Sequence, residues 1–520
     1  GKLARSIPID LALFDTTGDE AFWQRALQRA AFVVSRLAPD PEHGGYIYLP
    51  GRFDPRNCSN SVIDSGECTD ALAHLLLHPR AARVPADLRE GCKAAIQQNA
   101  ETYLRTAVVE KEITNQRLWG AMGLATAYQL EPQPEWLDAI RQSLHRSIAE
   151  QRSDGSWGYQ PHATQHGAHP GAADLTVYYH SRCLAFMLHI VNRVPASDPH
   201  CQVTRAVERG ISFLTTVITP DGLKPLSLEG KRWFWSGSYE AGSNAYDVFA
   251  LLQGASRFGQ EEWRRLALPV WRQLLRHQQA DGAILACLEP GARDFVCRDF
   301  HTADLAWPVQ VMDAIASLAN APLADLPSPR NNVASATYAR DAGVVRLDGS
   351  QRSVLVRTAK APANTQFGGA VGGGSLAAVV SVDGQRLVSI DREGESEGAF
   401  VATSKPSASR ALPRLRHFLR ENPPRREGAQ WSFVSRVLLR RGQWKDALSA
   451  LWFGYALPLT HALRDVASSR WATTCEVGVD QRADHLVFHA QVARPDGSVP
   501  EWARHLRVTH EYRLSADGLV

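Results

Sequence analysis

The sequence lacks any hydrophobic run long enough to cross a membrane, and its net charge is small. No stretch of 18 apolar residues occurs among the 520 residues, so we expect no transmembrane span. A formal net charge of +3 is too small to indicate nucleic-acid binding. The first residues lack the basic and apolar stretches of a signal peptide, and earlier removal of one stays open. The length alone indicates two or three domains.

The eight cysteines lack the spacing of a metal site. No Cys-x-x-Cys or His-Glu-x-x-His sequence occurs, so we predict no cofactor and no metal ligands, leaving a structural divalent cation open. Cys58 with Cys68, and Cys287 with Cys297, lie in turn-rich segments that could fold back to form disulfides. Reduced thiols are the alternative. Disulfides would fit a periplasmic or secreted location, which we expect.

The first 320 residues have few strand signals and are dominated by helical periodicity. The apolar spacing predicts helices over 22–37, 71–77, 118–130, 136–148, 206–217, 248–258 and 263–277. Glycine turns recur after helical stretches, and Gly155, Gly222 and Gly282 are separated by intervals that each hold two helices and their loops. Such spacing is typical of stacked helical hairpins. We therefore predict an N-terminal α/α toroid over residues 1–321.

The pattern changes in a proline-containing stretch, which we assign as a linker over 322–335. Beyond it the apolar period is two, and Asp348-Gly349 and Asp383-Gly384 are typical hairpin turns. Strands are expected over 343–347, 353–357, 376–382, 386–390, 431–439, 471–479 and 486–492, with a long basic loop over 404–428. These strands predict an antiparallel β-sandwich over 336–520. Its last residues resemble an interrupted hairpin, which leaves a longer native chain open.

The segment 154–189 carries the most informative side chains. It begins with the turn Asp154-Gly155-Ser156, continues as a histidine-containing loop and enters an apolar helix that contains Arg182. Its imidazoles and phenols are His162, His166, His169, Tyr178, Tyr179 and His180. This combination at a junction of loop and helix suits proton transfer at a sugar carbon. The alternatives are packed tyrosines and solvent-exposed loop histidines.

Three motifs resemble those of one enzyme family, both in sequence and in their order along the chain. The first is Thr114-Asn115-Gln116-Arg117-Leu118-Trp119, which contains Asn115. The second is the turn at Asp154 followed by Tyr179-His180 on an apolar helix, and the third is a glycine-rich β-domain pattern from Gly372 to Asp391. Together they resemble the heparinase II/III-like polysaccharide lyases over roughly residues 115–391. Two features depart from that family: Val177-Tyr178 replaces its usual Pro-x, and Gly372 to Gly374 replace its His-x-His. A histidine linked there to a metal or to charge neutralisation is therefore missing.

The resemblance implies an α/α toroid followed by a β-sandwich, and β-elimination on an acidic polysaccharide or oligosaccharide. Cleaving a 4-linked uronate requires neutralising its carboxylate, removing the C5 proton and protonating the departing O4. We assign proton transfer to Tyr179, with Tyr178 as second choice. A tyrosine base needs nearby positive charge, which Arg182 and His180 are expected to supply.

The carboxylate is expected to meet Asn115, Gln116 or Arg182, since amides and guanidinium groups donate hydrogen bonds to it. Because the β-domain histidines are missing, a histidine base or carboxylate donor has to come from His301 or from the loop that holds His162, His166 and His169. The predicted substrate-binding residues are Gln116, Trp119, His166, His169, His180, Trp235, Tyr239, Glu240, Asn244, Tyr246 and Trp307.

Two other functions remain as alternatives. A glycoside hydrolase on the same toroid would draw its acid and base from Glu67, Asp70, Glu240 or Asp304. A non-catalytic polysaccharide-binding protein would keep the binding groove alone. A lyase forms unsaturated uronate, a hydrolase forms new reducing ends without unsaturation, and a binding protein forms neither. We expect neither a nucleic-acid partner nor a membrane span, and leave the oligomeric state unassigned.

Overall fold

The chain is described by a computed structural model. The described residues are 1–40, 45–48, 59–161, 174–229, 242–284, 302–320, 334–359, 371–389, 397–398, 402–403, 435–436, 439–440, 442, 444–451, 470–482, 485–493, 499, 501–515 and 518–519. Within these ranges, no helix combines the length and hydropathy needed to traverse a bilayer.

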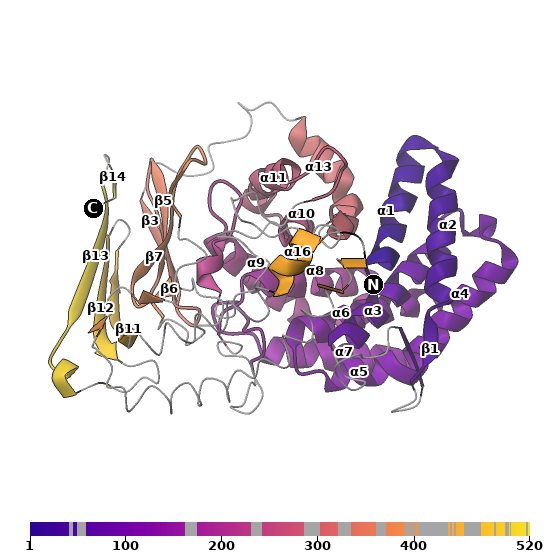
Figure 1. The fold of residues 1–520 in the computed structure, drawn as a ribbon, viewed down its shortest axis with the longest axis horizontal. Helices are drawn as coiled ribbons and strands as arrows, with labels where there is room; N and C mark the ends of the chain where they lie inside the picture. Colours follow the sequence, from indigo (N-terminus) through magenta and orange to yellow (C-terminus); the bar gives the residue numbers. More distant parts are fainter. Residues whose placement is uncertain are drawn as a thin grey trace.

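The N-terminal part is a closed ring of helices (Figure 1). Its inner members are α1 (Lys2–Thr17), α3 (Ser59–Leu77), α6 (Thr114–Leu130), α8 (Tyr178–Arg193), α10 (Asn244–Phe258) and the 3-10 turns η5 (Asp304–Ala306) and η6 (Pro308–Val311). Each inner helix packs against the next, α10 packs against η6, and η5 packs back against α1. The ring therefore closes between its first and last members.

A second layer of helices surrounds this ring. It consists of α2 (Glu20–Val34), α4 (Ala86–Asn99), α5 (Arg105–Glu110), α7 (Pro134–Ala149), α9 (Gln202–Val217), α11 (Glu261–Arg276) and α13 (Met312–Ala319). Outer helices such as α9 bury one side, whereas α6 is buried continuously from Thr114 to Ala127, as expected for a helix enclosed on all sides. The predicted α/α toroid is confirmed.

Short elements connect these helices. They are β1 (Leu37–Pro39), β2 (Tyr46–Tyr48), η1 (Ala81–Arg83), the π-helical turn η2 (Ala100–Leu104), η3 (Pro195–Ser197) and η4 (Leu226–Leu228). The predicted glycine turns are present, with φ of 88° at Gly155 and 82° at Gly222. A Cβ at Gly155 would lie 2.3 Å from the carbonyl oxygen of Arg209, and one at Gly222 would lie 2.4 Å from Pro269. Only glycine at these two turns allows them to lie so close to the outer helices, Gly155 against α9 and Gly222 against α11.

The C-terminal part contains two five-stranded antiparallel sheets. The first consists of β3 (Ser335–Ala339), β4 (Val344–Asp348), β5 (Arg352–Arg357), β7 (Ser375–Ser381) and β8 (Arg386–Ser389). The second consists of β10 (Ala402–Thr403), β11 (Arg470–Gln481), β12 (His485–Ala493), β13 (Val508–Ser515) and β14 (Gly518–Leu519). A short parallel pair, β6 (Val371–Gly372) with β9 (Glu397–Gly398), and the turn η8 (Glu501–Ala503) complete this part.

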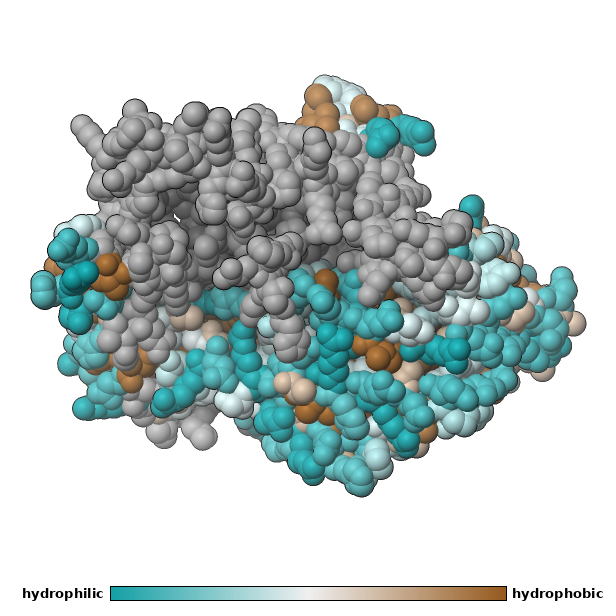
Figure 2. Space-filling view, turned by 90° about the horizontal axis from the view of Figure 1, so that it is seen from below, coloured by the Kyte–Doolittle hydropathy of each residue, from teal (hydrophilic) through white to brown (hydrophobic). Residues whose placement is uncertain are grey.

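The two large sheets face each other (Figure 1) and share an apolar core. Val345, Val354 and Val379 of the first sheet pack in one cluster with Leu486 of the second. The antiparallel β-sandwich is confirmed. The described part of the face in Figure 2 is mostly hydrophilic with scattered hydrophobic residues, as expected when most apolar side chains are used in these cores.

Two local predictions are wrong. A strand was expected over 431–439, but residues 435–436 and 439–440 are helical and α16 (Trp444–Leu451) follows them. Val434, Val437 and Leu438 have the three- and four-residue spacing of a helix, so the period was misassigned. In Figure 1, α16 is drawn over the helical part of the molecule, near the labels of α8 and α10.

The second error is the Cys58–Cys68 disulfide. Cys68 is a free thiol buried within α3, and burial raises the pKa of this thiol to about 11. A side chain enclosed between helices is not available to a preceding loop. Cys58 and the pair Cys287–Cys297 lie outside the described residues, as does most of the predicted linker, so the domain limits stay predictions.

Three arginines of the first sheet fasten it to the toroid. Arg346 Nη1 donates hydrogen bonds of 2.6 Å to the carbonyl oxygens of Thr215 and Ile218, at the end of α9. Arg386 forms an ion pair of 2.5 Å with Asp221. Arg357 donates to the carbonyl oxygen of Leu228 and, at 2.7 Å, to Asp174. The sheet thus holds the loops that lead into the inner helices.

Candidate functional site

The inner helices all begin at the same end of the ring. Residues from the first turns of α1, α8 and α10 contact one another and η5, whereas residues from later turns of α3, α6 and α8 meet at a separate level. Unpaired N–H groups and the helix dipole make each N-terminal end slightly positive. Several such ends gathered together favour an anionic ligand.

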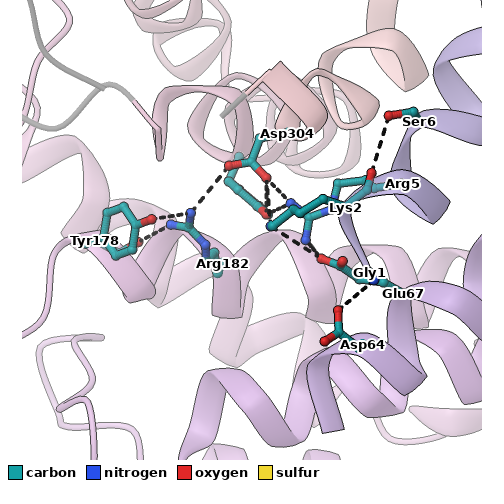
Figure 3. Close-up of polar contacts among 10 residues, drawn as sticks. Gly1, Lys2, Arg5, Ser6, Asp64, Glu67, Tyr178, Arg182 and Asp304 are labelled. Carbon is teal, nitrogen blue, oxygen red and sulfur yellow. Dashed lines mark hydrogen bonds and ion pairs between the residues drawn. The ribbon is translucent and has the colours of Figure 1, made fainter. Parts of the chain in front are cut away.

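A central ion cluster occupies this end of the ring. Its members are Lys2, Arg5, Glu67, Arg182, Tyr246 and Asp304, most of which are labelled in Figure 3. Arg5 forms ion pairs with both Glu67 and Asp304. Asp304 also accepts a hydrogen bond of 3.1 Å from the Tyr246 hydroxyl and lies 3.6 Å from Arg182 Nη2. The cluster therefore joins α1, α3, α8, α10 and η5.

Tyr178 and Arg182 form the edge of this cluster on α8. They are four residues apart and lie on one face of the helix. Arg182 Nη2 donates a hydrogen bond of 2.6 Å to the Tyr178 hydroxyl, and its guanidinium carbon lies 3.8 Å from the centre of the Tyr178 ring. In Figure 3, Arg182 lies between Tyr178 and Asp304. The structure thus brings together these two predicted residues.

Tyr179 lies next to this pair and is partly exposed. Its ring packs 4.9 Å from that of Tyr159 and 4.6 Å from that of Tyr178. Gln116 Nε2 donates a hydrogen bond of 3.3 Å to the Tyr159 hydroxyl, which places α6 beside α8 here. Burial raises the pKa of Tyr179 well above its usual value, and Arg182 offsets this only in part. Tyr179 therefore holds its proton at neutral pH.

Asn115 lies in the first turn of α6, four residues before Trp119 and on the same face. The indole of Trp119 lies 4.8 Å from the guanidinium carbon of Arg5, so this face points toward the central ion cluster. Asn115 is 1% exposed, and neither its Nδ2 nor its Oδ1 has a hydrogen-bond partner among the described residues. A buried amide without partners is costly, which makes it a candidate ligand-binding group.

His180 lies on the opposite side of α8 and does not fit its predicted substrate contact. Its Nε2 lies 2.8 Å from the carbonyl oxygen of Gly210, and its ring packs against Trp157 and Phe213. Burial lowers the pKa of His180 to about 3, so it does not supply positive charge to Tyr179. Two residues along a helix rotate a side chain by about 200°, which explains the difference from Tyr178.

Two further predicted substrate contacts are enclosed by packing. Trp307 is 4% exposed, and its ring lies 5.3 Å from that of Tyr246 and 5.0 Å from that of Phe249. Asn244 is fully buried and its Nδ2 donates to the carbonyl oxygen of Val270 in α11. Trp307 therefore forms part of an aromatic layer below the ion cluster, and Asn244 faces the outer helices.

Three of the four carboxylates proposed for a hydrolase, Glu67, Asp70 and Asp304, are already engaged, and the fourth, Glu240, lies outside the described residues. Arg5 stands between Glu67 and Asp304 and forms ion pairs with both. Although burial opposes its ionisation, His74 and His189 hold the pKa of Asp70 well below its usual value. Asp70 is therefore unsuited to donate a proton.

The other predicted site residues lie outside the described residues. They are His162, His166, His169, Trp235, Tyr239, Glu240 and His301. The segments that contain them precede α8, α10 and η5 in the chain. Within the described part of the chain, no cluster of histidine, cysteine and carboxylate side chains could hold a metal ion.

No sequence motif identifies Lys2 and Arg5 on α1, or Glu229 beside α8, as site residues. The signal at Arg5 is a charge among apolar residues of one helix: Ala4, Ile7 and Leu11 are buried, and so is Arg5 at 6% exposure. A charged residue buried on such a face needs a partner. The partners, Glu67 and Asp304, are far away in sequence and only the fold identifies them.

A scan against protein-family models finds no match, and a search of curated proteins likewise finds none. Solved structures with a similar fold include a sugar epimerase from a ruminal bacterium, with 11% identity and a TM-score of 0.45 over 60% of this chain and 86% of that chain. An unsaturated glucuronyl hydrolase from Bacillus sp. GL1 has 12% identity and a TM-score of 0.43 over 60% and 85%.

Heparinase III has 15% identity and a TM-score of 0.35 over 51% of this chain and 38% of its own. The names of these three proteins denote different reactions, and each TM-score lies below 0.5. A choice between reactions therefore depends on the geometry of the site itself.

Proposed function

We propose that this protein is a polysaccharide lyase that cleaves a uronate-containing chain by β-elimination at the N-terminal ends of the inner helices. The observation that carries the proposal is the buried amide of Asn115, which has no partner among the described residues. One turn further along α6, Trp119 packs against Arg5 of the central ion cluster, and the neighbouring Gln116 contacts Tyr159, which packs against the partly exposed Tyr179. An unpartnered amide among positive helix ends suits a carboxylate ligand.

In this proposal Asn115 donates a hydrogen bond from Nδ2 to the uronate carboxylate. Removal of the C5 proton creates an enolate-like intermediate whose negative charge is spread onto that carboxylate. The amide and the positive helix ends stabilise this charge where it develops. Arg182 adds positive charge from α8, 5.4 Å from the centre of the Tyr179 ring.

Tyr179 then donates its phenolic proton to the departing O4. Its raised pKa supports this role, because a group that keeps its proton at neutral pH is ready to act as an acid. The C5–H and C4–O4 bonds break and a C4=C5 double bond forms, so the step balances with one proton removed from C5 by a base and one proton supplied to O4 by Tyr179. We assign the base to one of His162, His166, His169 or His301, as the sequence predicts.

The hydrolase alternative is less well supported, because Arg5 separates and pairs Glu67 and Asp304. An inverting hydrolase needs about 6.5–9.5 Å between its two carboxyl groups, with room for water, and a retaining one about 5–5.5 Å. A guanidinium held between them blocks either arrangement.

The deciding experiment measures products. The protein is incubated separately with alginate, hyaluronan, heparan sulfate and polygalacturonate, and both ultraviolet absorbance of unsaturated uronate and new reducing ends are followed. A lyase gives both signals in equal amounts on at least one substrate. Reducing ends without absorbance would establish the hydrolase instead, and binding without either product would establish the binding protein.

A further inference from the structure

Glu229 is a fully buried carboxylate at the start of α8. It follows η4 directly in the chain, and its Oε1 accepts hydrogen bonds from the backbone N–H of Tyr178 at 2.5 Å and from the Thr176 hydroxyl at 3.2 Å. Its other oxygen has no hydrogen-bond partner among the described residues. A carboxylate in this position satisfies N–H groups that the helix leaves unpaired.

The groups around Glu229 connect it to both domains. Lys224 lies on the same loop and forms an ion pair of 2.5 Å with Asp247 of α10. Tyr178 and Tyr179 face Glu229 from α8. From the sandwich, Arg357 binds the carbonyl oxygen of Leu228, the residue directly before Glu229. The carboxylate therefore sits where the sheet, the loop and the inner helix meet.

We propose that Glu229 is the positioning residue of the two tyrosines, and that its ionisation holds the first turn of α8 in the geometry that elimination requires. This inference rests on the proposed function for its catalytic consequence. Its physical basis is local: a negative charge at a helix N-terminus stabilises the first turn, and a neutral carboxyl does so less. Tyr178 N–H is the donor, and the side chain of Tyr178 holds Arg182.

The ionisation of this group falls in an accessible pH range. Burial raises the pKa of Glu229 to about 7, while the N–H groups of Tyr178 and Val177, the Thr176 hydroxyl and Lys224 act in the opposite direction. The carboxylate is charged above that pH and neutral below it. Structural change at the tyrosines should follow the same titration.

The test uses the full-length protein labelled with 3-fluorotyrosine, and ¹⁹F spectra recorded between pH 5 and pH 9. The signals are assigned with Tyr178→Phe and Tyr179→Phe. We expect the signals of both tyrosines to move with a midpoint near pH 7 and to stop moving in Glu229→Gln. Thr176→Val should shift the midpoint upward, because it removes a hydrogen bond to the charged form.

Asp198→Asn is the matched control. Asp198 also caps a helix, accepting from the N–H groups of Val203 and Thr204 at the start of α9, but it lies away from the site. It should leave the titration unchanged. A titration that persists in Glu229→Gln, or none in the wild type, would overturn the inference, and Thr176→Val still tests it if Glu229→Gln does not fold.

The catalytic arm is a pH profile of the elimination reaction. The wild type should lose kcat below pH 7 as both Glu229 and the histidine base become protonated, and Glu229→Gln should have a lower kcat and a shallower acidic limb, because only the histidine base still titrates. An unchanged limb in the variant overturns the role of Glu229 in catalysis. If no substrate yields unsaturated product, the lyase proposal fails, whereas the ¹⁹F titration still decides whether Glu229 controls the tyrosines.

Discussion

The inner helices carry two buried polar groups that differ in how well their hydrogen bonds are satisfied. Deeper in the ring, the Asp70 network consists of Asp70, His74, Thr126, His189 and Arg193. Asp70 Oδ1 accepts a hydrogen bond of 2.6 Å from the Thr126 hydroxyl and lies 3.3 Å from both His74 Nδ1 and His189 Nε2. At the beginning of the same helices, Asn115 is more deeply buried than Asp70 and has no partner among the described residues.

The comparison contrasts a polar network whose hydrogen bonds are satisfied with a buried amide that has no hydrogen-bond partner among the described residues. A network whose donors and acceptors are matched holds helices in register. A buried polar group without a partner reduces stability, and such groups are typical of functional sites, where a ligand can supply the missing hydrogen bonds. Burial alone does not distinguish the two, so the contrast is best tested by changing one group at each level.

The largest effect is expected from Tyr179→Phe. This change removes only the proton that we assign to O4 and keeps the ring packed against Tyr159 and Tyr178. Elimination should fall by about 10³-fold or more, with the melting temperature unchanged. Tyr128→Phe, at the other end of α6, should retain full activity. Wild-type product formation by Tyr179→Phe would remove Tyr179 from the mechanism.

Asn115→Ala should lower kcat/KM by about 10²-fold without loss of stability, because the amide has no partner to lose. Asn99→Ala is the matched variant. Asn99 is also fully buried, but its Nδ2 donates a hydrogen bond of 2.7 Å to the Thr69 hydroxyl. Loss of this hydrogen bond should lower the unfolding free energy by about 1–3 kcal/mol and leave the activity unchanged. Urea unfolding and initial rates measure both. A change below about tenfold for Asn115→Ala would assign the carboxylate elsewhere.

Asp70→Asn should destabilise the fold by about 3 kcal/mol, because it disrupts a buried charged network. Activity per folded molecule should stay unchanged. Asp138→Asn provides the comparison, since Asp138 forms only an exposed ion pair with Arg141 and its loss should change stability by less than about 1 kcal/mol. Equal effects of the two variants would contradict the structural role of the Asp70 network.

The smallest expected effect is the pH dependence that His189 contributes. Burial lowers the pKa of His189 to about 4, so between about pH 6.5 and pH 4 the unfolded chain binds a proton that the folded chain excludes. Its contribution to stability is complete above pH 6.5 and decreases as the pH falls. Unfolding free energy should drop by about 2 kcal/mol from this residue between pH 7 and pH 5.

His189→Gln should reduce that drop when urea unfolding is compared at the two pH values. Some dependence should remain in this variant, because burial also lowers the pKa of His180, to about 3. Parallel pH dependences for the wild type and His189→Gln would show that His189 binds its proton equally well in the folded and the unfolded chain, which would contradict its lowered pKa.

Periodicity was sufficient to predict the architecture. The helical spacing over 206–217 and the hairpin at Asp383-Gly384 correspond to α9 and to the β7–β8 turn, because both patterns depend on residues close in sequence. The strand expected over 431–439 failed where apolar spacing fitted two periods. Apolar spacing therefore predicts a helix or a strand correctly where it fits one period only, and fails where it fits both.

The site was harder to predict, since its contacts join residues that are distant in sequence. Tyr178 and Arg182 were found because they are neighbours on one helix, but their separation from His180 depends on which face of α8 meets α9. Arg5 belongs to no recognisable sequence motif, and neither does Glu229 in its loop, although both have buried partners in the structure. Buried charges are assigned a role only when their partners are known.

The link from Arg5 to Asp304 also bears on how the protein folds. These residues are 299 positions apart, and their ion pair connects α1 with the last inner element. Contacts over such separations form slowly, because closing a long chain segment costs entropy before the contact stabilises it. The ion cluster should therefore assemble late, when the ring closes. A chain still emerging from the ribosome would therefore form its first helical hairpins before the ring closes around the ion cluster.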